Sequence, residues 1–235
     1  MLYIKIADLK IKIENKYDYV RWLCKDYVID ECEDYDLCVS VSESMIDNEI
    51  SMAEGEVSRG YAEGVCIYRE ICYQLPTKFN SYLLHSALIE YEGKGYAFTA
   101  KSGTGKSTHI ALWQKAFGDK VRIVNGDKPI VRYKDGEFIA YGTPWCGKEG
   151  FAINGSVPLK ALCFIERSAT NSIEPMSASD AVLRVFHQVL TPKDTETLDA
   201  LFPLLDLTLK QVPCYLLKCN MDVEAAVVAY NGMNK

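Results

Sequence analysis

The order of apolar and polar residues predicts short strands interrupted by a few helices. Residues 2–6 and 9–13 alternate between apolar and polar or charged side chains, which is typical of half-buried strands. A helix around 18–25 and a strand over 37–42 follow, and then an acidic stretch to about residue 56 to which we assign no element. The period changes often in this region, which therefore reads as a small mixed lobe.

One long helical pattern separates this lobe from the rest. Between Ala62 and Leu75 most apolar side chains fall on one helical face, and we expect Pro76 to end the helix. Beyond it, the runs Tyr82–Tyr91 and Tyr96–Thr99 flank a glycine-rich turn and predict a hairpin.

Short β runs continue around further helices to the end of the chain, and Asp135-Gly136 marks a second hairpin. We expect strands over 121–125, 130–133, 138–141, 159–165 and 214–217, and helices over 105–117, 178–190, 195–205 and 223–230. The sequence therefore predicts a mixed α/β fold with a small lobe at 1–78 and a larger domain at 79–235.

The segment from Tyr96 to His109 runs an apolar strand into a glycine-punctuated turn and then a helix. Gly103 and Gly105 permit backbone conformations closed to residues with a Cβ, so successive N–H groups can converge on one anion. The helix directs its positive end toward the same anion. This layout is typical of a loop that binds nucleotide phosphates, and the expected binding residues are Ser102, Gly103, Thr104, Gly105, Lys106, Ser107 and Thr108.

Within this loop the side chains of Lys106 and Ser107 have distinct expected roles. Lys106 would lie on the β- and γ-phosphates of ATP or another nucleoside triphosphate, and the Ser107 hydroxyl would help to hold Mg²⁺. Ala100 occupies the first glycine position of the usual Gly-x4-Gly-Lys-Ser/Thr pattern, which is tolerable if its φ is negative. The alternative is an ordinary strand-turn-helix rich in small residues.

Composition and charge restrict the partners. The 235 residues, of which 49% are hydrophobic and 25% charged, suffice for one core and a smaller lobe. The net charge of −6, without a sustained basic run, argues against a nucleic-acid partner. An anionic ligand must therefore be met by local positive groups.

Targeting signals and cysteine spacing favour the cytoplasm. The amino-terminal residues lack the apolar centre of a signal peptide, and no apolar run is long enough to span a membrane. The nine cysteines are odd in number and form no Cys-x2-Cys pair, which fits reduced thiols better than disulfides or a zinc site.

A candidate metal-binding or proton-accepting group follows the loop helix. The apolar run Val121–Asn125 leads to Asp127, and a parallel neighbouring strand would place this carboxylate at the same sheet edge as Lys106. Asp127 would bind Mg²⁺ or accept the proton of an attacking hydroxyl. The alternative is a turn aspartate that precedes Lys128-Pro129.

The histidines carry little information by themselves. His85 lies in an apolar setting one hairpin upstream of the loop, where a lone histidine is more often structural than catalytic. His109 and His187 have no motif around them, and we interpret both as structural.

The stretch from Leu84 to Ser107 resembles the catalytic core of HPr kinase/phosphorylase, with the same interval of 21 residues from His85 to Lys106 and the same Gly-x-Gly hairpin. The resemblance continues to Asp127 and covers about residues 82–134. It implies a phosphate-loop core related to that of phosphoenolpyruvate carboxykinases. It also implies catalytic roles for His85, Lys106 and Asp127, and Mg²⁺ ligation by Ser107 and Asp127.

Two departures from that family bear on the reaction. The family has two consecutive aspartates where this chain has Gly126-Asp127, and an acidic residue where it has Thr108. The family's segment for recognising its protein substrate is not evident either. We therefore expect a relative whose phosphoryl acceptor has changed.

Three further residues are candidates for contacting substrate or phosphate. Lys148 and Trp145 lie in a glycine-rich loop after a strand, where Lys148 would neutralise the transferred group and Trp145 would wall the acceptor pocket. The alternatives are a surface turn and a Trp inserted in the core. Arg167 ends a buried run and would stabilise charge on the γ-phosphate, or else form a surface ion pair.

The leading hypothesis is an ATP- and Mg²⁺-dependent kinase that phosphorylates a hydroxyl on serine, a peptide or protein side chain, or another small molecule. The second is a nucleotide-binding regulator or maturation partner that transfers no phosphate, motivated by Ala100, Thr108 and Gly126. A decarboxylating carboxykinase is a weaker third, since it needs a Lys-His-Asp metal site that three histidines do not readily supply. The sequence does not indicate an oligomeric state.

Overall fold

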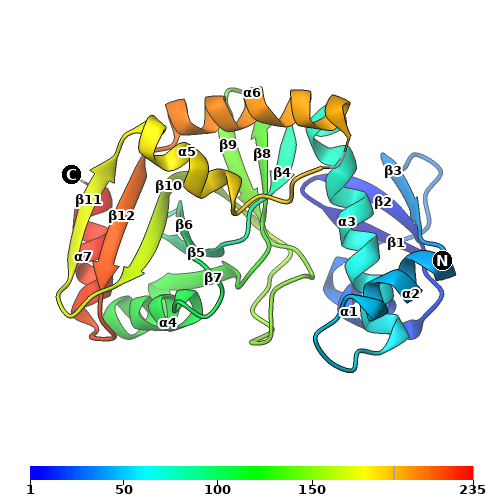
Figure 1. Ribbon diagram of the computed structural model, residues 1–235, viewed down its shortest axis with the longest axis horizontal. Helices are drawn as coiled ribbons and strands as arrows, with labels where there is room; N and C mark the ends of the chain where they lie inside the picture. The colour runs from blue at the N-terminus through cyan, green and yellow to red at the C-terminus, as the bar shows by residue number, and fades with distance from the viewer. Residues whose placement is uncertain (193, 235) are drawn as a thin grey trace.

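Over residues 1–192 and 194–234, which are the residues described, the computed structural model has one sheet of three strands and one of nine (Figure 1). Helices flank both sheets, so the predicted α/β class is confirmed. Lys235, the last residue of the predicted larger domain, lies outside the described residues. In the described part, no helix combines the length and apolar character needed to cross a bilayer.

The small sheet forms from the amino-terminal hairpin and one later strand. Strand β1 (Leu2–Ile6) pairs antiparallel with β2 (Leu9–Glu14), and β3 (Leu37–Ser40) pairs parallel with β2. Helix α1 (Asp18–Leu23) and a 3₁₀ turn (Lys25–Tyr27) lie between β2 and β3. The alternating residues of β2 give an alternating burial pattern, as the sequence predicts.

Two helices complete this lobe, and both differ from the sequence prediction. Helix α2 (Glu43–Ser51) forms in the acidic stretch, begun by Ser42, whose hydroxyl accepts the N–H of Met45. Helix α3 (Arg59–Phe79) continues past Pro76 and ends at Asn80, which adopts a left-handed conformation with φ 48°. The prediction that Pro76 ends the helix is wrong, because burial of this face in the core outweighs the lost hydrogen bond.

The large sheet has the strand order β4-β8-β9-β10-β6-β5-β7, with β12 and β11 branching from β10. Its longest strand, β10 (Ser156–Arg167), pairs antiparallel with β9 at its start and parallel with β6 and β12 further on. The burial of β10 alternates at first and then becomes continuous, since helices cover both faces of its second half. The other strands are β4 (Ser81–Leu83), β5 (Ala87–Tyr91), β6 (Lys94–Thr99), β7 (Val121–Asn125), β8 (Ile130–Lys134), β9 (Glu137–Tyr141), β11 (Ser172–Met176) and β12 (Cys214–Cys219).

The predicted run Tyr82–Tyr91 is two strands in different parts of this sheet. β4 pairs with β8, whereas β5 pairs with β6 and β7, and His85 lies in the break between them. The β5–β6 hairpin turns through Glu92 and Gly93, both with positive φ, and the predicted Asp135-Gly136 hairpin turns in the same way. The break at residues 84–86 frees the main chain around His85 for contacts with distant segments.

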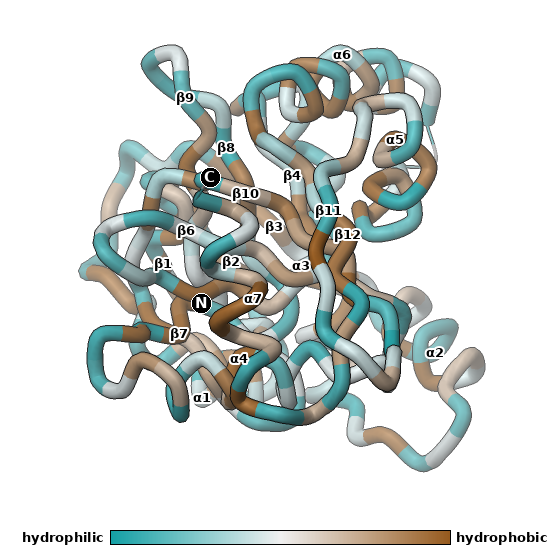
Figure 2. The backbone as a smooth tube through the Cα atoms, turned by 90° about the vertical axis from the view of Figure 1, so that its left-hand side faces the viewer, coloured by the Kyte–Doolittle hydropathy of each residue, from teal (hydrophilic) through white to brown (hydrophobic). Residues whose placement is uncertain are grey.

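Helices cover the two faces of the large sheet (Figures 1 and 2). Helices α4 (Lys106–Phe117) and α7 (Glu224–Met233) pack on one face through Trp113 and Ala225, with a further 3₁₀ turn at Gly118–Lys120. Helices α5 (Ala178–Phe186) and α6 (Thr195–Gln211) pack on the other through Val185 and Leu201. Helix α6 also reaches α3 of the small lobe.

The small lobe and the large sheet share one apolar cluster, in which Trp145 and Tyr141 join the residues of β1, β2 and α3. Polar contacts add to it, since Tyr141 Oη donates to Asp8 at 2.9 Å and Tyr27 Oη donates to the carbonyl of Ile153 at 3.0 Å. The proposed division at residues 1–78 and 79–235 remains a prediction, and the two parts are packed together.

Candidate phosphate-binding loop and catalytic cluster

The loop between β6 and α4 has the backbone geometry that its glycines indicated. Gly103 has φ 76° and Gly105 has φ 130°, conformations that strongly favour glycine. Ala100 is buried and is not among the residues with positive φ, so its methyl group causes no backbone strain. The departure from the usual first glycine is therefore structurally neutral.

The start of α4 offers unpaired main-chain donors. Gly105 occupies the N-cap position, where no side chain caps the helix. Within the described ranges, the N–H groups of Lys106, Ser107 and Thr108 have no hydrogen-bond acceptor in the protein. An uncapped helix start behind two glycines is the arrangement that binds phosphate in other proteins.

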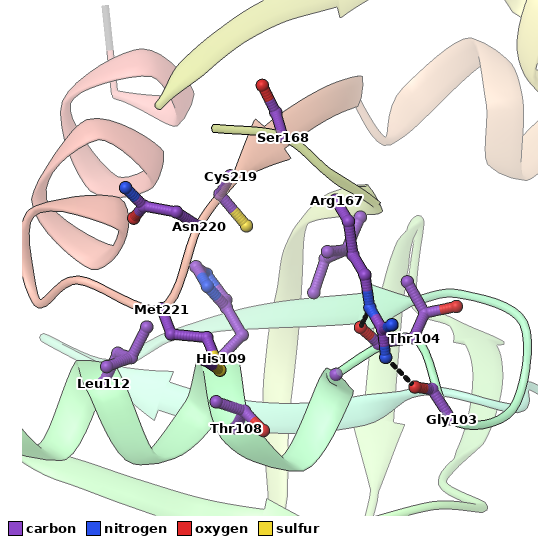
Figure 3. Close-up of a pocket in the computed structure, with 12 residues that line it drawn as sticks. Gly103, Thr104, Thr108, His109, Leu112, Arg167, Ser168, Cys219, Asn220 and Met221 are labelled. Atoms are coloured by element: carbon purple, nitrogen blue, oxygen red, sulfur yellow. Dashed lines mark hydrogen bonds between the residues drawn. The ribbon is translucent and has the colours of Figure 1, made fainter. Parts of the chain in front are cut away.

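Arg167 holds the opposite side of the loop. From the end of β10 its guanidinium donates to the carbonyl oxygens of Thr104, at 2.9 Å, and of Gly103 (Figure 3). These contacts satisfy the two carbonyl oxygens and tie the loop to the end of β10. Arg167 therefore lies at the loop, where it binds the main chain, and its expected contact with the γ-phosphate stays a prediction.

A pocket of about 460 Å³ lies beside this contact, between α4 and the ends of β10 and β12 (Figure 3). Its lining combines apolar and polar side chains, and includes Thr108, Leu112, Ile165, Cys219, Asn220 and Met221. Thr108, at the position where the resembling family has an acid, is one of its walls.

Lys106, His85 and Asp127 meet at the inner side of the loop. Lys106 Nζ lies 3.0 Å from His85 Nε2 and 3.2 Å from the carbonyl oxygen of Ala100. His85 Nε2 lies 3.1 Å from Asp127 Oδ1. The three residues that the resemblance marked as catalytic therefore form one contiguous cluster, although they come from three separate segments.

The route by which Asp127 reaches the cluster differs from the expected one. Strand β7 is not a direct neighbour of β6, because β5 lies between them and pairs antiparallel with both. Two antiparallel pairings restore the direction, so β6 and β7 end at the same edge of the sheet. The prediction of a parallel neighbour is wrong, but Asp127 does lie at the same sheet edge as Lys106, and His85 contacts both.

Burial and charge act in opposite directions on the two charged members. Burial lowers the pKa of the Lys106 ammonium, and Asp127 opposes this shift. Burial raises the pKa of Asp127, but its hydrogen bonds with His85 and Lys128 lower the pKa by more. The pKa of this carboxyl therefore lies well below its usual range. At neutral pH Asp127 is a carboxylate.

Gln188 fixes the other side of the His85 ring, and sequence reasoning missed it. The Gln188 Oε1 atom lies 3.1 Å from His85 Nδ1, and the main-chain N–H of His85 donates to the Gln188 carbonyl at 2.6 Å. An amide oxygen there can accept a proton from Nδ1, and the contact turns the opposite nitrogen, Nε2, toward Lys106 and Asp127.

Asn125 and Thr143 position the segment that carries Asp127. Asn125 is fully buried, and its Oδ1 accepts the N–H groups of Asp127, at 2.9 Å, and Lys128, at 2.6 Å. Its Nδ2 donates to the carbonyl of Thr143 at 2.9 Å, and the Thr143 hydroxyl donates to the Lys128 carbonyl at 2.7 Å. The Val-Asn end of the strand was the only sequence signal, because the partner in this network lies 18 residues away.

Lys128 also belongs to the cluster around Asp127, and no sequence motif had pointed to it. Its ammonium forms an ion pair with Asp127 Oδ2 and lies 5.9 Å from the centre of the Tyr68 ring. Both oxygens of Asp127 are therefore engaged, one with His85 and one with Lys128.

Gly126 explains why this chain has one aspartate where the resembling family has two. A Cβ at this position would lie 2.7 Å from the carbonyl oxygen of Cys146, which is too close for any side chain. The loop carrying Cys146 is held there because the N–H of Gly126 donates to the Phe151 carbonyl at 2.8 Å. A second carboxylate is excluded by this loop.

The two candidates from that loop lie in different environments. Trp145 is 7% exposed, donates to the Gly64 carbonyl at 3.1 Å and packs on Tyr68, which favours the reading of a Trp inserted in the core over a wall of the acceptor pocket. Lys148 is exposed in the turn at 147–150, and no ion pair or side-chain hydrogen bond to it occurs within the described chain.

The remaining histidines are outside the cluster. His109 is 2% exposed, and its Nε2 accepts the indole N–H of Trp113 at 3.1 Å. Burial lowers the pKa of His109 to about 3, which keeps the ring neutral. These contacts agree with the structural role that we inferred for His109, while His187 lies exposed after α5.

The donor set suits a cation that arrives with a nucleotide. In the described part of the chain, no three His, Cys, Asp or Glu side chains gather closely enough to hold a metal alone. Mg²⁺ commonly takes one or two protein ligands and completes its shell with phosphates and water. Ser107 and Asp127 offer oxygen ligands of the kind such a site uses. Lys128 would first have to give up its ion pair with the Asp127 carboxylate.

Comparison with known proteins gives a family match and remote structural likenesses. The model of the family described as SynChlorMet cassette protein ScmC matches residues 65–224. No curated protein matches. Among solved structures, the Hpr(Ser) kinase/phosphatase from Coxiella burnetii is similar at 10% identity and a TM-score of 0.38, over 63% of this chain and 88% of that one. The chain belongs to the family of SynChlorMet cassette protein ScmC.

Proposed function

We propose that this protein is a phosphotransferase that moves the γ-phosphoryl group of a nucleoside triphosphate, such as ATP, to a hydroxyl acceptor. The observation that carries the proposal is the meeting of unpaired loop N–H groups with the Lys106–His85–Asp127 cluster. Phosphoryl transfer needs little covalent chemistry from a protein and depends on positioning and charge neutralisation. These groups supply both.

Each part of the nucleotide has a corresponding surface. The loop N–H groups and Lys106 would bind the β- and γ-phosphates, and the pocket beside Leu112 and Met221 has room for the nucleoside. Mg²⁺, held by Ser107 and Asp127, would neutralise charge on the phosphate oxygens.

Asp127 and His85 would manage the acceptor proton. The carboxylate of Asp127 would accept a hydrogen bond from the acceptor hydroxyl and orient its oxygen toward the γ-phosphorus. As the new O–P bond forms and the bond to the leaving nucleoside diphosphate breaks, the hydroxyl proton passes to Asp127, which His85 Nε2 holds in place at 3.1 Å. Gln188 holds the other side of the His85 ring, so that the ring stays against Asp127.

Mass spectrometry of hydroxyl-bearing acceptors incubated with Mg·ATP tests the proposal, with release of the diphosphate as a second readout. We expect the Lys106→Ala and Asp127→Asn variants to lose at least about a thousandfold in transfer, because each removes charge stabilisation specific to the transition state. The Lys160→Ala variant, which removes an exposed positive charge on β10, should keep full activity. Unchanged turnover in either cluster variant would contradict the proposal.

A non-catalytic nucleotide-binding regulator is the second candidate, because Gly126 leaves a single carboxylate in the cluster. It predicts tight binding of Mg·ATP without phosphate release for any acceptor. Calorimetric titration together with the transfer assay therefore separates the two functions.

A further inference from the structure

A second pocket, of about 330 Å³, opens on the other side of the loop from the one shown in Figure 3. It lies between the loop, the end of β10 and the end of α5. Its polar walls are contributed by Lys101, Glu166, Arg167, Arg184, His187 and Gln188.

Positive charge predominates around this pocket, although the protein carries a net charge of −6. Arg184 pairs with Glu166 at 2.8 Å, and these charges offset each other. Arg167 donates its hydrogen bonds to neutral carbonyl groups, so no negative charge offsets its positive charge there. Lys101 is exposed and has no ion pair within the described residues. Two positive charges are therefore left over.

This pocket adjoins the catalytic cluster through two residues. Ala100 lines it, and the carbonyl oxygen of the same residue lies 3.2 Å from Lys106 Nζ. Gln188 lines it as well and contacts the His85 ring at 3.1 Å. A molecule in the pocket is thus next to the position that the γ-phosphoryl group would take.

We propose that the pocket binds an anionic group, a carboxylate or a phosphate, on the acceptor whose hydroxyl is phosphorylated. This inference rests on the proposed function and names the substrate class. The Arg184 guanidinium presents the planar donor pair that binds such anions, and Lys101 and Arg167 supply the excess charge. The acceptor hydroxyl then extends past Gln188 toward Asp127.

Glu166 acts as an internal competitor for Arg184. Its carboxylate occupies the guanidinium in the absence of substrate, and both side chains are about two-fifths exposed, at 42% and 40%. An incoming anion must displace it. Removing Glu166 therefore strengthens anion binding, while removing Arg184 weakens it, and a purely structural role for the pair would not produce opposite effects.

Three compounds of one carbon skeleton test the inference: D-glycerate, glycerol 3-phosphate and glycerol. Each is titrated against protein saturated with Mg·AMP-PNP, so that the phosphate loop is occupied. We expect one of the two anions to bind at least about tenfold more tightly than glycerol, the difference a charge-assisted contact gives. The better anion distinguishes a carboxylate from a phosphate on the acceptor.

Variants identify the binding group. Arg184→Met should weaken binding of the preferred anion about tenfold, and Glu166→Gln should strengthen it about threefold. In both variants the affinity for the nucleotide analogue should be unchanged. Lys160→Met is the matched control for loss of one positive charge. The inference would be overturned if all three compounds bind equally well, or if both variants bind the anion with the same affinity as the parent protein.

The transfer assay separates this inference from the function on which it rests. If phosphorylation proceeds equally well on neutral and anionic acceptors, the function stands and the anion pocket does not. If the anion binds through Arg184 but no acceptor gains a phosphoryl group, the pocket stands and the phosphotransferase proposal fails.

Discussion

The proposed phosphate-binding loop and the cluster around Asp127 adjoin at one edge of the sheet, yet they are constructed differently. The loop is one continuous segment, and its shape follows from Gly103, Gly105 and the start of α4. The cluster joins residues from separate segments, with Asp127 held by Asn125 and His85 held by Gln188. Substitutions in the loop should therefore act mainly on ligands, whereas substitutions around the cluster should also affect the fold.

The largest effect on stability is expected from Gly126→Asp, which restores the first of the two consecutive aspartates of the resembling family. The new side chain would meet the Cys146 carbonyl, and its carboxylate would be buried, so we expect a loss of roughly 4 kcal/mol in the free energy of unfolding. Urea denaturation measures it. Gly55→Asp, where a Cβ has no neighbour within 4 Å, is the control and should change stability by less than about 0.5 kcal/mol. Equal stability of both variants would refute the close contact.

Removal of the Asn125 side chain should have the next largest effect. Asn125→Ala leaves the N–H groups of Asp127 and Lys128 and the carbonyl of Thr143 without partners, at a cost of about 3 kcal/mol. Transfer activity should also fall, since Asp127 is no longer held. The exposed Asn154→Ala is the control. A variant that loses activity without losing stability would mean that Asn125 contacts substrate rather than positioning Asp127.

The loop helix should make stability depend on pH through His109. The pKa of His109 is about 3 in the folded protein against its ordinary value of 6.5, so below pH 6.5 the unfolded chain carries a proton that the folded protein does not. The free energy of unfolding should fall by about 2 kcal/mol between pH 7 and pH 5, with no contribution above pH 7. His109→Gln, which can still accept the Trp113 N–H, should lack this part of the slope. Identical slopes in denaturation experiments would contradict it.

The smallest effect is expected for Ala100→Gly, which restores the usual loop pattern. Because Ala100 is not in a positive-φ conformation, glycine adds only freedom to the unfolded chain and should cost about 0.5–1 kcal/mol. Nucleotide affinity should stay within about twofold of the parent. A marked gain in affinity would show that the Ala100 methyl group obstructs the phosphates.

The same contrast explains what the sequence could predict. The loop, its helix and the two hairpins depend on residues close in sequence, and the structure agrees with those predictions. The continuation of α3 through Pro76 and the break at His85 depend on packing and on distant partners. The local sequence patterns therefore predicted both of them wrongly. Gln188, Asn125 and Lys128 carry no motif, and only the tertiary structure shows that they contact His85 or Asp127.

The most direct test of the central claim is a calorimetric titration of the protein with Mg·AMP-PNP, alongside the Lys106→Ala variant. The unpaired loop N–H groups and Lys106 predict one saturable site that the variant weakens at least about tenfold. No binding to the parent protein, or equal binding to both, would contradict the account.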